Sequence, residues 1–310
     1  MKKRWYIAAM AGAAAAIGAS AVYFTNTIMF MRKKEEAFIR QREIQAGHWI
    51  EEDFDRLPKE NVAVRSPFGY PIDCLFITAH PSSNKWMIFC HGITENKYSS
   101  IRYMNLFRKQ GFNAVIYDHR RHGQSGGRTS SYGYYEKDDL AAVVRELKKR
   151  HGKDLIFGIH GESMGAATAI LYGGSSYAEA DFYIADCPFS SFASQCEYRI
   201  KAETGLPPKL ILPAGNLLLK LRDGYKVQDI SPLEAVQKIH KPVLFIHSES
   251  DDYIPAAMTK ELYEAKPGPK ELFIAAKGAH AQSYNENPEE YEAAVRKFLA
   301  SHVFQGHEAG

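Results

Sequence analysis

Short apolar runs alternate with amphipathic stretches along most of the chain. Two strand-like runs, residues 62–65 and 72–78, flank a Pro67-Phe68-Gly69 turn and predict an antiparallel hairpin. Further strands are expected at 86–90, 113–117, 155–159, 182–185, 243–247 and 271–275, with helices at 99–110, 136–150, 164–173, 256–265 and 288–299. Most of these strands are short apolar runs, as in strands that are buried on both faces of a parallel sheet. The pattern therefore predicts an α/β fold with a doubly wound, mostly parallel sheet.

The interval from about residue 190 to 235 breaks this alternation. It holds a long helix-like stretch where a single crossover helix would suffice. We expect it to form a small helical cap over the candidate active site described below. The alternative is a surface segment that only packs on the sheet. The expectation depends on the density of Leu and Pro at Leu206, Pro207, Pro208, Leu210, Ile211, Leu212, Pro213 and Leu217 to Leu219.

An uncharged segment, residues 5–31, lies between the basic clusters at residues 2–4 and 32–34. It exceeds the roughly 20 residues that span a bilayer. We therefore expect residues 1–34 to form an N-terminal transmembrane helix that anchors the protein in a membrane. The alternative is a cleaved signal peptide, because Ala19-Ser20-Ala21 offers a small-residue cleavage site after a basic region. The basic residues are balanced on the two sides, so the side of the membrane on which the domain lies is left open.

The rest of the chain divides into two parts. Residues 35–60 are charged and permissive for helix, and we expect them to form a stalk without chemistry between the anchor and the domain. Residues 61–305 are expected to form the α/β domain, with the cap inserted at about 190–235. No internal repeat or low-complexity tract interrupts it.

Composition and charge exclude several classes of protein. The 310 residues are 45% hydrophobic and 24% charged, which is enough for one large domain with a full core. The formal net charge is only +3 and the basic residues are scattered apart from short clusters, so nucleic-acid binding is excluded. The four cysteines have no CxxC spacing and are expected to be buried free thiols.

A candidate nucleophile follows the strand expected at 155–159. Gly161-Glu162-Ser163-Met164-Gly165 fits the pattern G-x-S-x-G between a strand and a helix. Such a serine sits on a sharp turn, and the flanking glycines remove the Cβ atoms that would clash there. The motif in this position predicts Ser163 as a nucleophile, with a helix N-terminus where an oxyanion would develop. The alternative is a tight turn without chemistry.

A serine nucleophile needs a base, and the base needs an acid that holds its tautomer. Two adjacent carboxylates, Asp251 and Asp252, follow the strand at 243–247, and His280 follows the last strand. The order serine, acid, histidine, with each residue placed after a strand, predicts a catalytic triad at the carboxyl edge of the sheet.

The oxyanion hole is expected from two backbone amides. His91-Gly92-Ile93 ends the strand expected at the centre of the sheet, and such a turn aims the Ile93 amide at the substrate oxygen, where the Met164 amide joins it. His91 itself is expected to be structural. The histidines His119 and His122 alternate with arginines, whose charge opposes a cation, so we expect no metal there. The expected acyl transfer requires no cofactor.

Together, these motifs resemble the α/β-hydrolase superfamily. The residues that carry the resemblance are His91-Gly92, Asp118, Arg120, Gly123, Ser125, the elbow around Ser163, His247, Asp251, Pro255, Gly278 and His280. Over about residues 61–303 the chain looks most like the membrane-anchored Bem46-like serine hydrolases and the bacterial esterase and acyl-aminoacyl-peptidase branch. It departs from the commoner pattern at Arg121 and Ser248, where Gly is usual. The family's His-x-x-x-Asp-x-x-(Val or Ile)-Pro pattern implies Asp251, rather than Asp252, as the acid.

The sequence thus predicts a serine hydrolase that cleaves a carboxylic ester or related acyl bond through an acyl-enzyme. Ser163 is the nucleophile, His280 the base and Asp251 the orienting acid, and the partner is a small acyl ester. One alternative is a peptidase of the acyl-aminoacyl type, which is disfavoured because such enzymes usually carry a large gating domain. Another is a binding module that keeps the fold without the chemistry.

Overall fold

The computed structural model describes residues 2–304, so the predicted limits at Met1 and residue 305 lie outside it. Its centre is a single eight-stranded sheet with the order β1-β2-β4-β3-β5-β6-β7-β8. The strands are β1 (Lys59–Arg65), β2 (Pro71–Ile77), β3 (Lys85–Cys90), β4 (Asn113–Tyr117), β5 (Ile156–Glu162), β6 (Phe182–Asp186), β7 (Val243–Ser248) and β8 (Lys270–Ala275).

The pairing of the strands follows the hydrophobic pattern. β2 is antiparallel to β1 and to β4, which confirms the opening hairpin. All pairs from β4 through β8 are parallel, and β3 to β7 are buried almost throughout. The carboxyl ends of β3, β5, β6, β7 and β8 therefore meet at one edge of the sheet, where ligands bind in open α/β folds.

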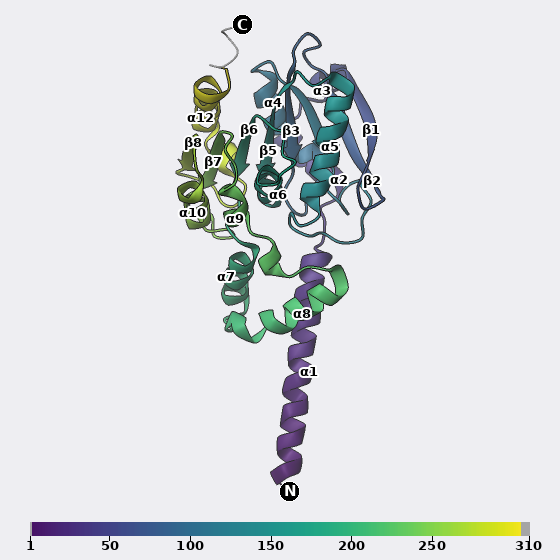
Figure 1. Ribbon diagram of the computed structural model, residues 1–310, viewed down its shortest axis with the longest axis vertical. Coiled ribbons are helices and arrows are strands. Elements are labelled where there is room, and N and C mark those ends of the chain that lie inside the picture. The colour runs from purple at the N-terminus through teal and green to yellow at the C-terminus, as the bar shows by residue number, and fades with distance from the viewer. Residues whose placement is uncertain (1, 305–310) are drawn as a thin grey trace.

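Helices cover both faces of the sheet (Figure 1). One apolar cluster joins the sheet to α5 (Glu136–His151), α6 (Met164–Gly173), α9 (Pro232–Val236) and α10 (Ala256–Ala265). A second cluster joins the opposite face to α3 (Glu51–Arg56), α4 (Ile101–Arg108), α11 (Ser283–Glu286) and α12 (Pro288–Leu299). The doubly wound α/β arrangement that the sequence predicted is confirmed.

The segment between β6 and β7 is mainly helical. It contains α7 (Phe192–Thr204) and α8 (Leu212–Asp223), with short 3₁₀ turns at Pro208–Leu210 and Val227–Asp229. Gly205 and Gly224 end the two helices in the left-handed conformation, which glycine adopts at little cost. The helices lie beyond the carboxyl edge of the sheet, on the side from which the N-terminal helix departs (Figure 1). This is the segment that the sequence assigned to a cap.

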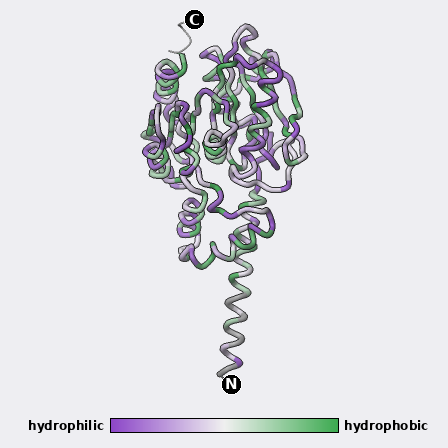
Figure 2. Tube along the Cα trace, in the orientation of Figure 1, coloured by the Kyte–Doolittle hydropathy of each residue, from purple (hydrophilic) through white to green (hydrophobic). Residues whose placement is uncertain are grey.

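The N-terminal segment forms one long helix, α1 (Lys2–Met29), and the expected membrane span is not supported. Within the residues described, no helix is both long enough and apolar enough to cross a membrane. α1 carries no charged residue from Trp5 to Met29, and its hydropathy along the chain is drawn in Figure 2. Several side chains between Ile7 and Ala14 lie outside the described set, so part of the predicted anchor does too.

Residues 35–60, which the sequence assigned to a charged stalk, pack against the domain. They form α2 (Glu36–Gln45) and α3, and Ile39 of α2, Phe54 of α3 and Trp49 between the two helices are buried. Trp49 and Phe54 belong to the apolar cluster on the α4 face. Glu43 of α2 is also buried, because ion pairs with Arg42 and Arg102 compensate its charge.

Candidate active site

Ser163 stands on a strained turn between β5 and α6. Its backbone angles are φ 56° and ψ −117°, outside the regions that a serine ordinarily adopts. A Cβ on Gly161 would lie 2.3 Å from the Gly165 carbonyl oxygen, and one on Gly165 would lie 2.0 Å from the Cys90 carbonyl oxygen. The Ser163 amide donates to the Asp186 carbonyl at 2.8 Å and ties the turn to β6. The two glycines are thus required by close packing of the backbone around the serine.

The three predicted triad residues come together at the carboxyl edge of the sheet. The Ser163 hydroxyl and His280 Nε2 are 2.8 Å apart, and His280 Nδ1 lies 2.7 Å from Asp251 Oδ2. They come from the turn after β5, the loop after β7 and the loop after β8. This geometry holds the imidazole with one nitrogen toward a carboxylate and the other toward a hydroxyl, as base-assisted nucleophilic attack requires.

Asp251 is held as a carboxylate by its surroundings. Its Oδ1 accepts hydrogen bonds from the Tyr253 and Ile254 amides, both at 2.9 Å, and its Oδ2 lies 3.0 Å from His247 Nε2. Burial by itself would raise the pKa of Asp251, but the bonds from His247 and His280 outweigh it and bring the pKa well below its usual range. Asp251 is therefore ionised at neutral pH and fixed in orientation.

Asp252 points elsewhere. It is exposed, and its backbone carbonyl accepts a hydrogen bond from the Tyr198 hydroxyl at 3.0 Å. Neighbouring side chains in an extended loop face different directions, so only one of the two carboxylates reaches His280. The loop places Asp251 in that position.

The residues predicted to form the oxyanion hole, Ile93 and Met164, line the same cavity as Ser163. The turn that carries Ile93 packs closely against the turn at Ser163. A Cβ on Gly92 would lie 3.3 Å from Glu162 Oε1 and 3.6 Å from Ser163 Cβ. Met164 is the first residue of α6, so its amide lies at the positive end of a helix. Both backbone amides thus belong to segments that adjoin the serine.

The cavity above Ser163 has a volume of about 450 Å³ and is mostly apolar. Three parts of the chain build it: the loops at the sheet edge, the cap helix α7, and the last turns of α1. Its size and lining are typical of small-molecule sites. Apolar residues of its lining include Phe24, Ile28, Tyr132, Phe189, Phe192 and Ile200.

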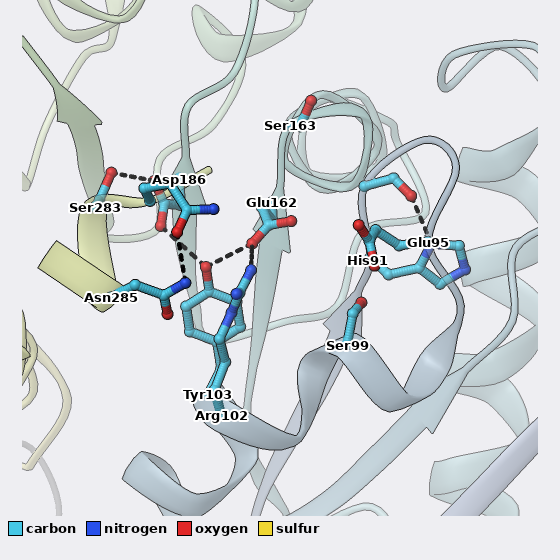
Figure 3. A network of polar contacts seen from close by, with 12 residues as sticks. His91, Glu95, Ser99, Arg102, Tyr103, Glu162, Ser163, Asp186, Ser283 and Asn285 are labelled. Atoms are coloured by element: carbon cyan, nitrogen blue, oxygen red, sulfur yellow. Dashed lines mark hydrogen bonds and ion pairs between the residues drawn. The ribbon is translucent and has the colours of Figure 1, made fainter. Parts of the chain in front are cut away.

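Behind the serine lies a buried polar network (Figure 3). Glu162 pairs with the Arg102 guanidinium and accepts a hydrogen bond from the Tyr103 hydroxyl at 2.6 Å. The Ser283 hydroxyl donates to Asp186 Oδ1 at 3.1 Å. Burial, reinforced by the nearby Glu162 charge, raises the pKa of Asp186 to about 7. The network fixes Glu162, which directly precedes Ser163, and sequence spacing gave no sign of it because its partners are 59 to 97 residues apart.

His91, His119 and His122 are buried together. His91 Nε2 accepts a hydrogen bond from the His119 amide at 3.0 Å, and the His122 ring lies edge-on to the His91 ring. Burial lowers the pKa of each of the three. They remain neutral and support the turn that leads to Ile93.

Two residues beside the triad had not been assigned a role from sequence. His247 contacts both Asp251 and, at 2.6 Å, the Thr259 hydroxyl, so it helps to hold the Asp251 carboxylate in place. Cys187 lies with Asp251 and His280 in a cluster whose potential ligand atoms are within 4.8 Å of one another. Burial raises the pKa of the Cys187 thiol well above its usual value, which disfavours the thiolate that a metal would need. The sequence contains a signal for His247, because it lies near the end of β7, four residues before Asp251.

Comparisons with known proteins are in accord with this geometry. Residues 81–211 match the family model described as serine aminopeptidase, S33. The chain is 49% identical to the Bacillus subtilis protein YqkD over 294 residues, which are 94% of this chain and 95% of YqkD. It is 25% identical over 229 residues to the Homo sapiens α/β hydrolase domain-containing protein 17C, covering 73% of this chain and 58% of that one.

Solved structures share the fold. The esterase Pf2001 of Pyrococcus furiosus superposes with a TM-score of 0.66 at 25% identity, covering 82% of this chain and 94% of that one. Est1E of Butyrivibrio proteoclasticus, solved with ferulic acid bound, superposes with a TM-score of 0.63 at 17% identity, covering 78% and 99% of the two chains. The second likeness concerns the fold alone.

Proposed function

Since the chain belongs to the α/β-hydrolase superfamily, in one family with YqkD, we propose that it is a serine hydrolase that cleaves a carboxylic ester through an acyl-enzyme. One observation carries the proposal. Ser163, His280 and Asp251 form a hydrogen-bonded chain, with distances of 2.8 and 2.7 Å, at the wall of an apolar cavity.

The mechanism assigns one step to each group. His280 Nε2 takes the proton of Ser163 as Oγ bonds to the carbonyl carbon, and the Ile93 and Met164 amides hold the oxyanion. As the intermediate collapses, His280 gives this proton to the departing alcohol, and the acyl group stays on Ser163. Water then attacks the acyl-enzyme as His280 takes its proton, and His280 returns that proton to Ser163 Oγ as the acid leaves. Asp251 keeps the tautomer and stabilises the imidazolium.

The family model raises a second candidate, an aminopeptidase, but the lining of the cavity favours the ester. An aminopeptidase needs an anionic group that holds the substrate's free amine. Among the described residues that line the cavity, Glu203 alone carries a carboxylate, and it pairs with Arg199 at 2.7 Å. The surface near Ser163 is formed instead by Ile28, Phe189 and other apolar residues.

Labelling with a fluorophosphonate probe tests the proposal. The full-length chain should react at Ser163, and the Ser163→Ala variant should not. In a panel of p-nitrophenyl esters and peptide anilides, turnover should appear on the esters. A folded chain that neither reacts with the probe nor hydrolyses an ester would overturn the proposal and favour a binding module. Turnover on anilides alone would establish the peptidase.

A further inference from the structure

One face of α1 lies along the cavity that contains Ser163. The lining positions recur every four residues in two adjacent rows, which places them on one side of a helix. Between Ala19 and Ile28 this stripe is about 14 Å long, at 1.5 Å per residue. The lining residues from this part of the chain are Ala19, Ser20, Tyr23, Phe24, Thr27, Ile28 and Met31.

Contacts with the cap and the domain hold this face in place. Phe24 packs against Gly215 of α8, where a Cβ would lie 2.5 Å from the Phe24 ring. Arg222, also from α8, donates to the Thr25 hydroxyl and, at 2.7 Å, to Asn26 Oδ1. At the other end of the stripe the Ser130 amide donates to the Met29 carbonyl at 3.1 Å. The last turns of α1 are therefore part of the folded domain.

The cavity follows this stripe and is apolar close to Ser163. Ile28 is buried in the same apolar cluster as Met164 and Phe189. Toward its N-terminus α1 leads away from the sheet (Figure 1). A ligand that extends from Ser163 along the stripe thus passes Ile28 and Phe24 and reaches Ser20 and Ala19 at the outer end.

From this arrangement we propose that α1 forms one wall of an acyl-chain subsite, and that the substrate is an ester of an unbranched aliphatic acid of medium length. The inference rests on the proposed function, because the carbonyl must lie at Ser163. The apolar stretch between α1 and α7 is too long to be filled by an acetyl group, and its length of about 14 Å along α1 limits how much of a longer chain it can bury. Chain-length specificity is then determined in part by Ile28 and Phe24.

Hydrolysis of p-nitrophenyl esters from acetyl to palmitoyl by the full-length protein tests the subsite. We expect kcat/KM to be highest near octanoyl or decanoyl and to exceed the acetyl value by at least about tenfold, since each buried methylene adds to binding. Ile28→Trp, which fills the cavity, should lower the ratio of decanoyl to acetyl kcat/KM about tenfold. Ile28→Ala, which enlarges it, should move the optimum to a longer chain.

The two Ile28 variants should shift the preferred chain length in opposite directions, which a general loss of stability would not do. Val22→Trp is the matched control, because Val22 is half exposed on α1 and does not line the cavity. Its chain-length profile should equal that of the parent. An optimum at acetyl in the parent, or a profile that neither Ile28 variant moves, would overturn the inference.

A binding measurement separates this inference from the proposed function. In the Ser163→Ala chain, which has no nucleophile, calorimetry should detect decanoic acid, and Ile28→Trp added to that chain should weaken its Kd about tenfold. If the parent hydrolyses no ester but this shift in Kd appears, the proposed function fails and the acyl subsite stands. If esters are hydrolysed but decanoic acid binds equally well to both chains, the subsite fails and the hydrolase stands.

Discussion

Asp251 and Asp252 are adjacent in one loop but have different surroundings. Asp251 Oδ2 accepts from both His280 and His247, whereas the exposed side chain of Asp252 faces away from this cluster. Two amide donors also fix the second oxygen of Asp251. The carboxylate therefore determines which nitrogen of His280 carries the proton, and so whether the other can accept one from Ser163.

Asp251→Asn should leave the fold intact and lower kcat by about 10⁴-fold, because the amide imposes the wrong tautomer on His280, as the equivalent change does in a serine protease. Asp252→Asn should stay within about twofold of the parent, because its side chain contacts no member of the triad. Steady-state rates on one p-nitrophenyl ester, with circular dichroism to check folding, provide the measurement. Loss of activity in Asp252→Asn with near-normal Asp251→Asn would reverse the assignment.

At the scale of elements, the sequence predicted the sheet well because its strands are continuous apolar runs. The runs at 113–117 and 243–247 coincide with β4 and nearly with β7, and the glycines at 161 and 165 located the elbow. The packing of α2 escaped prediction for a physical reason. Its charged pattern is that of a solvated helix, yet Glu43 is buried. Its partner Arg102 comes from a distant part of the chain, so the local pattern could not show that the charge would be compensated.

α2 also holds the loop that carries the predicted oxyanion amide. Arg42 donates to both oxygens of Glu95, at 2.9 and 3.0 Å, and the Lys34 amide donates to the Thr94 carbonyl at 2.8 Å. Thr94 has a φ of +73°, a costly conformation for a β-branched residue, so the loop depends on such contacts to keep its shape. Burial alone would raise the pKa of Glu95, but Arg42 and Lys34 lower it to about 2.

Arg42→Met should therefore lower kcat about tenfold with a smaller change in KM, because a displaced Ile93 amide weakens transition-state binding more than substrate binding. Arg40→Met is the matched control, since Arg40 lies on the same helix and its ion pair with Glu51 is exposed. The two variants are compared by their kcat and KM, measured below the melting temperature of both. Equal effects of the two substitutions on kcat would show that α2 does not position the loop.

At the scale of the whole molecule, the described residues form three apolar clusters, and α1 contributes to one of them. Two clusters pack on the faces of the sheet and draw on helices of the domain. The third joins Phe24, Ile28 and Met29 to the cap helices and to Met164, which follows Ser163. The cap and α1 should therefore share their stability, while the sheet keeps its own.

A chain that begins at Arg32 tests whether the cap shares its stability with α1 and not with the sheet. This chain lacks α1 but keeps the contacts that Lys33 and Lys34 make with the domain. With Phe24 and Ile28 gone, the cap loses apolar surface that it buries in the intact protein, and its local opening becomes easier. Hydrogen exchange should then be at least about tenfold faster for the amides of α7 and α8. The amides of β3 to β6 should exchange at the parent rate, because their clusters contain no residue of α1. Uniformly faster exchange throughout the domain, or unchanged exchange in the cap, would mean that α1 and the cap do not form one cooperative unit.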